Sequence, residues 1–169
     1  MKLLTIFAAA LLAAASASAQ PSPAQTATGS IGGTAITIKY SAPSVKGRQI
    51  FGDGGLVAKD RTAPIWRAGA NSATALHTEG DLDIGGLTVP KGDYTLFVNL
   101  KDPGQWELVI NKQTGQWGLT YKADMDLGRV KMKMSKPPAL VEQLKYTIGA
   151  GSITLEWENH VASVAVKAK

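Results

Sequence analysis

The chain has 169 residues, of which 44% are hydrophobic, and 18 basic against 13 acidic side chains give it a formal net charge of +5. These values fit one globular domain of ordinary size with a sizeable core. The basic residues are scattered rather than clustered between stacking aromatic residues, which argues against nucleic-acid binding. The lack of cysteine excludes disulfides, a thiolate nucleophile, a cysteine metal site and a lipoprotein anchor.

Residues 1–19 have the pattern of a cleavable secretion signal. Lys2 supplies the positive start, residues 3–15 are almost wholly apolar, and Ala17-Ser18-Ala19 has the small-x-small pattern of a cleavage site. The apolar run is shorter than the roughly 20 residues of a membrane-spanning helix, and no later stretch is as apolar. We therefore expect cleavage after Ala19, no membrane span, and a periplasmic or secreted protein.

Residues 20–33 consist almost entirely of Pro, Ser, Thr, Ala and Gly, with little to bury, which predicts a flexible tether. The folded domain is expected to span residues 34–169. Within it, apolar and polar side chains alternate at the period of a half-buried strand. The alternating segments are 34–40, 73–79, 94–100, 106–110, 130–134, 144–148, 153–157 and 164–166, and residues 82–89 indicate a hairpin.

About nine short strands with glycine-containing turns, and no convincing amphipathic helix, predict an all-β fold. The expected architecture is a single-domain antiparallel β-sandwich or jelly-roll-like fold.

A candidate ligand site lies in residues 65–74, whose sequence is IWRAGANSAT. Trp66 offers a flat face for a sugar, the Arg67 guanidinium suits a carboxylate or phosphate, and the Asn71 amide both donates and accepts hydrogen bonds. Arg48, in the preceding glycine-rich stretch, could converge on the same place. The alternative is that Trp66 fills the core, Arg67 pairs with a carboxylate and Asn71 holds a turn.

Motifs for catalysis and metal binding are weak. The two histidines, His77 and His160, have neither a metal-binding spacing nor a neighbouring nucleophile elbow, so each is interpreted as a surface or packing residue. Met132 and Met134 share a strand face that would suit Cu(I), but alternating methionines more often fill a core. We assign no metal, no cofactor and no catalytic residue. The carboxylate pairs, for which turn and solvent roles suffice, are Asp81 and Asp83, Asp124 and Asp126, and Glu156 and Glu158.

Several motifs follow one another along the chain. They are Tyr40-Ser41-x-Pro43, Lys46-Gly47-Arg48-x-Ile50-Phe51-Gly52, Trp66-Arg67-x-Gly69-Ala70-Asn71, Leu87-x-Val89-Pro90-x-Gly92-x-Tyr94 and Gln116-Trp117-Gly118. In this order they resemble the bacterial domain-of-unknown-function family 2911, over roughly residues 34–166. The resemblance implies an exported, β-rich protein with no established activity. The residues that recur in the family correspond here to Ser41, Pro43, Arg48, Trp66, Arg67, Asn71 and Trp117.

We therefore expect a non-enzymatic module that binds a small polar or anionic ligand, or an envelope glycan. In this hypothesis Arg48 and Arg67 bind charge, Trp66 and Trp117 stack on the ligand, and Asn71 fixes its orientation. One alternative is an envelope hydrolase, in which a carboxylate pair or His77 would have to converge beside Trp66. Another is a structural or protein-interaction domain, which would bury residues 65–74 and expose an apolar patch.

Overall fold

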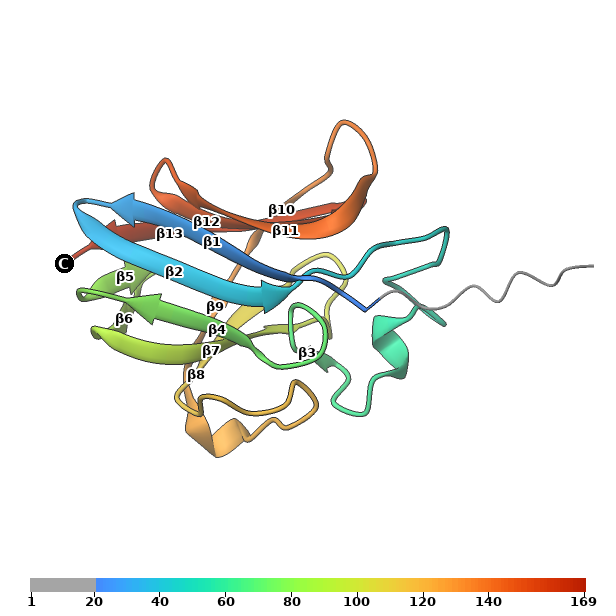
Figure 1. The fold of residues 1–169 in the computed structure, drawn as a ribbon, viewed down its shortest axis with the longest axis horizontal. Helices are drawn as coiled ribbons and strands as arrows, with labels where there is room; N and C mark the ends of the chain where they lie inside the picture. Colours follow the sequence, from blue (N-terminus) through green and yellow to red (C-terminus); the bar gives the residue numbers. More distant parts are fainter. Residues whose placement is uncertain (1–20) are drawn as a thin grey trace, which may run out of the picture.

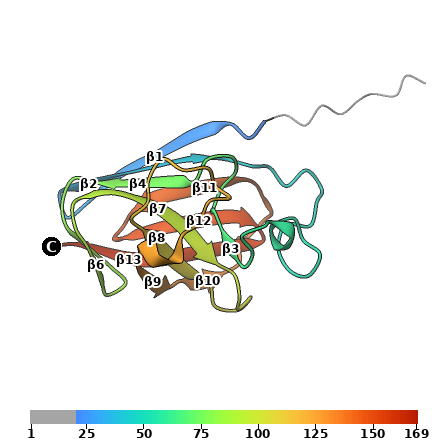
Figure 2. The ribbon, with the colours of Figure 1, turned by 90° about the horizontal axis from the view of Figure 1, so that it is seen from below.

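The computed structural model describes residues 21–169, so the predicted secretion signal and its cleavage site lie outside the described residues. Two antiparallel sheets form a β-sandwich (Figure 1, Figure 2). The predicted fold class is confirmed, although the chain forms thirteen strands rather than about nine. Between residues 21 and 169, no helix is long and apolar enough to cross a membrane.

The first sheet has the strand order β1-β2-β4-β7-β8-β9, with β3 paired to β7. Its strands are β1 (Ala24–Ile31), β2 (Thr34–Ser41), β3 (Ile65–Trp66), β4 (Thr74–Thr78), β7 (Gly92–Asn99), β8 (Glu107–Asn111) and β9 (Asp126–Lys131). The second sheet has the order β11-β12-β13-β5-β6, with β10 paired to β13. Its strands are β5 (Leu82–Ile84), β6 (Leu87–Val89), β10 (Lys133–Ser135), β11 (Val141–Gly149), β12 (Ser152–Glu158) and β13 (His160–Ala168). Two short 3₁₀ helices, η1 (Val57–Lys59) and η2 (Ala123–Met125), lie in the connections.

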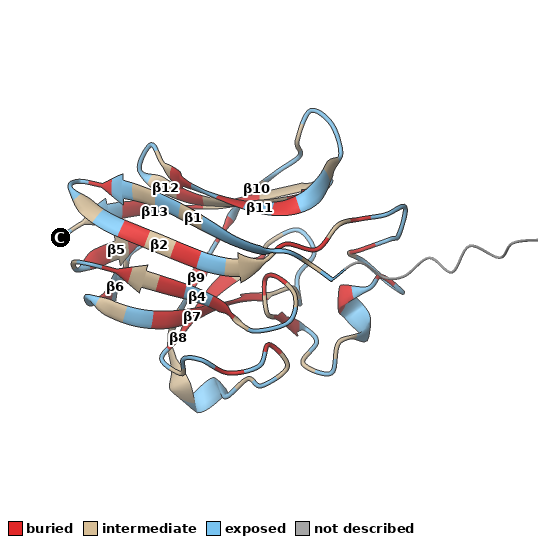
Figure 3. Cartoon of the chain, viewed as in Figure 1, coloured by how far each residue is buried: buried red, intermediate tan, exposed pale blue. Residues whose placement is uncertain are grey.

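The core lies between the facing sides of the two sheets, and in several strands alternate residues are buried there (Figure 3). Strand β12 illustrates the rule, because Ile153, Leu155 and Trp157 are buried while the residues between them are half-exposed. Strand β7 departs from it, since Phe97 is buried on the opposite side. There the connection that contains η2 covers the sheet, and the Tyr121 ring meets the Phe97 ring edge-on at 5.0 Å.

The predicted tether is wrong for residues 24–31, which form strand β1. This strand pairs with β2 along its whole length, from Ala24 opposite Ser41 to Ile31 opposite Thr34. The alternation of large apolar residues is missing because β1 approaches β11 through a small residue. A Cβ atom added to Gly29 would lie 2.6 Å from the carbonyl oxygen of Ile148. Backbone pairing and close approach therefore hold β1, and the folded domain begins before residue 34.

The alternating run at residues 130–134 spans two strands in different sheets. Val130 lies in β9, and the chain then passes through Met132 into β10, where Met134 lies. Met132 is buried in the core and Met134 packs against it. Both side chains therefore serve packing in this structure.

Candidate functional site

Trp66 is part of the core rather than of a ligand surface. Its side chain is only 2% exposed. Its ring stacks on Trp157, with centroids 5.7 Å apart and planes at 17°, and meets the rings of Phe51 and Trp106 edge-on. The structure thus contradicts the stacking role predicted for Trp66 and matches the core-filling alternative.

Arg67, Asn71 and Trp117 do come together, around Gly118. The Gly118 N–H donates to the Asn71 carbonyl oxygen at 3.0 Å. A Cβ atom at Gly118 would collide with Arg67 Cδ and would lie 2.5 Å from the Asn71 oxygen, so only glycine allows this approach. Trp117, next in the chain, is 53% exposed. We call residues 113–118, with Asn71 and Ser72 beside them, the Trp117 loop.

The charge of Arg67 is already compensated within the protein. Its Nη2 atom lies 3.4 Å from Asp60 Oδ2, and the Arg67 side chain is 16% exposed. Asn71 has a left-handed backbone with φ of 59°, as expected of a residue that holds a turn. An anionic ligand would therefore have to compete with Asp60 for Arg67.

Arg48 lies away from these residues, at a different depression. Its guanidinium donates to the carbonyl oxygens of Val45 at 3.0 Å and Ser44 at 2.6 Å. The depression, of about 560 Å³, is lined by residues 21–23 together with Ala42, Ser44, Lys46, Arg48 and Gln143. The five predicted binding residues therefore occupy three places rather than one.

A cavity of about 570 Å³ lies beside η1 and involves residues that the sequence did not single out as a site. Its floor contains the aromatic side chains of Phe51, Trp106 and His160, and Asp53 and Lys101 are the charged residues that line it. The remaining lining residues are small or apolar, namely Gly52, Val57, Ala58, Ala63, Pro64, Leu100 and Pro103. We call this space the His160 cavity.

His160 is held in place from three sides. Its ring stacks on Trp106 with centroids 5.0 Å apart, and Phe51 meets it at 4.8 Å. Its Nδ1 atom lies 3.3 Å from Glu158 Oε2, without the alignment of a hydrogen bond. The other Glu158 oxygen accepts the Ile50 N–H at 3.0 Å. Glu158 therefore connects His160 to the glycine-rich stretch that forms one wall of the cavity.

The electrostatics of His160 favour its neutral form. Burial lowers the pKa of the imidazole below its usual value, although the Glu158 carboxylate acts in the opposite direction. Glu158 also has a left-handed backbone with φ of 55°, which is costly for a residue with a Cβ atom. A neutral imidazole beside an apolar cavity can exchange hydrogen bonds with a small molecule through its other nitrogen, Nε2.

Sequence reasoning missed this cavity because its walls come from four separated segments. Residues 51–58, 63–64, 100–106 and 160 share no motif. The one available signal was the β12–β13 hairpin, in which Glu158 and His160 flank a single turn residue. The interpretation of His160 as a packing residue is half correct, because it packs on Trp106 and also lines the cavity.

His77 and the carboxylate pairs do not form a hydrolytic centre beside Trp66. Both nitrogens of His77 are engaged on the surface of the first sheet, by Asp93 at 2.7 Å and by Glu79 at 2.9 Å. These contacts raise the pKa of His77, with Glu79 the larger cause. Asp81 and Asp83 accept backbone N–H groups in turns, as predicted for them. Within residues 21–169, no group of three or more His, Asp or Glu side chains is arranged to hold a metal ion.

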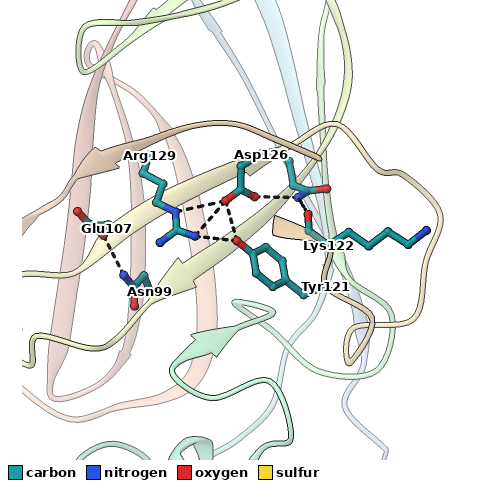
Figure 4. Close-up of polar contacts among 7 residues, drawn as sticks. Asn99, Glu107, Tyr121, Lys122, Asp126 and Arg129 are labelled. Atoms are coloured by element: carbon teal, nitrogen blue, oxygen red, sulfur yellow. Dashed lines mark hydrogen bonds and ion pairs between the residues drawn. The ribbon is translucent and has the colours of Figure 1, made fainter. Parts of the chain in front are cut away.

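The Asp126 carboxylate forms the centre of a separate polar cluster (Figure 4). It accepts hydrogen bonds from the Tyr121 hydroxyl at 2.6 Å, from Asn111 at 2.8 Å and from Arg129 at 3.1 and 3.2 Å. Asn111 also donates to the Lys122 carbonyl oxygen. The contacts of Tyr121 with Asp126 and of Lys122 with Asn111 join the η2 connection to the sheet, so the cluster has a structural role.

The family model described as "Protein of unknown function (DUF2911)" matches residues 22–166. The chain belongs to the DUF2911 family. No curated protein and no solved structure matches it. The family match begins just before β1 of this DUF2911 protein, so the strand predicted as a tether belongs to the family domain. The match also includes the whole lining of the His160 cavity and the Trp117 loop.

Proposed function

We propose that this DUF2911 protein is an exported, non-enzymatic module that binds a small molecule in the His160 cavity. The observation that carries the proposal is the arrangement of His160, stacked on Trp106 and backed by Glu158, in the floor of an apolar cavity. Apolar concave sites with a few fixed polar groups are typical of small-ligand sites. The volume of about 570 Å³ falls within the range of such sites, roughly 300 to 1,000 Å³.

The lining defines the chemistry of the ligand. Val57, Pro64 and Leu100 offer apolar walls, so the body of the ligand is apolar. A polar group on the ligand would exchange a hydrogen bond with the neutral His160 imidazole. Asp53 and Lys101 carry opposite charges, so an anionic head would be drawn to Lys101 and a cationic head to Asp53.

The same lining favours binding over hydrolysis. His160 and Glu158 resemble the base and the orienting carboxylate of a catalytic triad. The described residues that line the cavity include no serine, threonine or cysteine that could act as the nucleophile. The cavity is therefore better suited to holding a molecule than to cleaving one.

Three single-ring probes test the proposal and the charge of the head group together. Benzyl alcohol, benzoate and benzylamine share a phenyl ring and carry a neutral, an anionic and a cationic head, respectively. Binding to the native state raises the unfolding free energy by about 1.4 kcal/mol when the ligand is at ten times its Kd. We expect at least one probe to raise Tm and to move the imidazole NMR signals of His160 but not those of His77.

Two alanine-to-tryptophan variants supply the matched comparison. Ala58 lines the cavity from η1, whereas Ala123 is exposed in η2, the other 3₁₀ helix. Ala58→Trp fills the cavity and should abolish the response, and Ala123→Trp should retain it. A response that survives Ala58→Trp, or no response to any probe at millimolar concentration, would contradict the proposal.

A further inference from the structure

The Trp117 loop presents an aromatic surface that the fold fixes in place. Trp117 is 53% exposed, whereas Trp66, Trp106 and Trp157 are at most 3% exposed. Trp117 forms a bridge with Ser72, its carbonyl oxygen accepts the Thr120 N–H at 2.8 Å, and its neighbours on both sides bond to residues 71 and 73. An exposed tryptophan side chain costs hydration free energy, and here these contacts fix the backbone that carries it. Its location therefore needs an explanation other than core packing.

Buried polar atoms without partners occur in the same loop and on Arg67 beside it. Among the described residues, six buried side-chain polar atoms have no hydrogen-bond partner, and three of them are Arg67 Nε, Gln113 Oε1 and Gln116 Nε2. Gln116 is 9% exposed, and its amide oxygen accepts only a long bond from Thr95 at 3.4 Å. Such groups are rare in folded proteins and usually find a partner in bound water or a ligand. Two donors and one acceptor, in the Trp117 loop and on the neighbouring Arg67, are therefore available for water-mediated contacts.

The Trp117 loop is polar, and none of its residues is charged. Asn71, Ser72, Thr114 and Thr120 are exposed, and each offers an amide or hydroxyl group. The guanidinium of Arg67, whose side chain lies against Gly118, is paired with Asp60. A flat aromatic ring surrounded by groups that both donate and accept hydrogen bonds matches a pyranose, which has an apolar C–H face and a rim of hydroxyl groups.

We infer that the Trp117 loop binds a neutral glycan, with one pyranose ring stacked on Trp117 and its hydroxyl groups bonded to Asn71, Ser72 and ordered water. A β-1,4-linked chain of glucose or N-acetylglucosamine fits best, because equatorial substituents leave a flat apolar face on each ring. A protein partner fits less well, since stable interfaces bury roughly 800 Å² on each side around several large apolar residues. The other two exposed large apolar residues, Leu56 and Leu140, belong to η1's connection and to the loop before β11.

Tryptophan fluorescence reports on this site selectively, because only one of the four tryptophans is exposed. The full chain would be titrated with cellotetraose and with chitotetraose, and quenching by iodide measured with and without sugar. We expect a saturable change in emission and protection of Trp117 from iodide. Trp117→Ala should abolish sugar binding, Trp117→Phe should retain binding to within about tenfold of the wild type, and Leu140→Ala should leave binding unchanged. Binding by all three variants would be measured by calorimetry, since both Trp117 variants lose the exposed fluorophore.

The inference is independent of the His160 cavity, and the test keeps the two apart. His160→Gln should weaken the response to the single-ring probes and leave oligosaccharide binding unchanged. The inference is overturned if neither oligosaccharide protects Trp117, or if Trp117→Ala still binds. It is also overturned if protection from iodide appears without sugar and grows with protein concentration, because a second copy of the chain would then cover Trp117.

Discussion

The imidazole ring of His160 lies parallel to the indole ring of Trp106, with centroids 5.0 Å apart and planes at 17°. Phe51 completes the group from the glycine-rich stretch, and its ring also contacts Trp66 and Trp157 in the core. The floor of the cavity is therefore continuous with the aromatic core. Ligand binding at His160 would consequently need little rearrangement of the floor, which reduces the entropy cost of binding.

The two histidines should titrate on opposite sides of the ordinary histidine pKa. Contacts with Glu79 and Asp93 raise the pKa of His77, whereas burial lowers the pKa of His160. NMR titration of the imidazole signals should show His77 changing above pH 6.5 and His160 below it. Removing the Glu158 carboxylate by Glu158→Gln should lower the pKa of His160 further, because the attraction that offsets burial is lost.

The same shifts give opposite dependences of stability on pH. Because the folded pKa of His160 is lower than 6.5, the unfolded chain binds this proton more readily than the folded protein does. The stability that His160 contributes is therefore present above pH 6.5 and is lost as the pH falls through the folded pKa. His77 contributes stability that is present below pH 6.5 and is lost as pH rises through its higher folded pKa. Urea unfolding of His160→Gln and His77→Gln between pH 5 and 8 separates the two. An identical pH profile for both variants would contradict the assignment.

Two tryptophans in predicted binding motifs should differ sharply in their effect on stability. Trp66→Ala removes a ring packed against three others and should lower the free energy of unfolding by about 3–5 kcal/mol. Trp117→Ala removes an exposed ring and should change it by no more than about 0.5 kcal/mol. Denaturant unfolding of the two variants provides the measurement. A large loss for Trp117→Ala would make that residue a packing residue and would weaken the glycan inference.

The predictability of this fold depended on how each strand buries its side chains. Strands such as β12 bury alternate large residues, so the sequence alone predicts this strand from the spacing of Ile153, Leu155 and Trp157. Strand β1 packs through the small residues Ala27 and Gly29 and places only Ile31 in the core, so it lacks a periodic signal of large apolar residues. Trp66 was misassigned because a tryptophan among small residues looks the same in sequence whether the chain turns it inward or outward.

The candidate site was harder to predict than the fold. The predicted residues Arg67, Asn71 and Trp117 meet because Gly118 permits a close approach, and neither distance nor orientation follows from the spacing of the motifs. The His160 cavity depends on long-range packing of separate loops, which local sequence cannot show.

Strand β1 should be sensitive to any side chain at residue 29. Gly29→Val places a Cβ atom against the Ile148 backbone, and relief of that contact requires β1 and β11 to separate. Overpacking of this kind costs about 1–3 kcal/mol. Ser30→Val adds the same side chain at the next residue, which is exposed, and should be nearly neutral. Equal stability of the two variants in urea would show that β1 contributes little to the fold.

The Asp126 cluster predicts both a stability change and a tyrosine titration. Burial and the Asp126 carboxylate raise the pKa of Tyr121 to about 12. Asp126→Asn leaves the burial but removes the charged acceptor shared by Tyr121, Asn111 and Arg129. The pKa of Tyr121 should therefore fall toward 10, and the free energy of unfolding at pH 7 should fall by about 1–3 kcal/mol.

Tyrosinate absorbance between pH 9 and 12.5 measures the pKa of Tyr121, and urea unfolding measures the loss of stability. Asp124→Asn is the matched control, because the Asp124 carboxylate is exposed. Since the pKa of Tyr121 is raised in the fold, its contribution to stability is present below pH 10 and is lost as pH rises toward about 12. Asp126→Asn should flatten this alkaline loss, whereas Asp124→Asn should retain it. If Asp126→Asn and Asp124→Asn behaved alike, the η2 connection would have to be held to the sheet mainly by the contact between Tyr121 and Phe97.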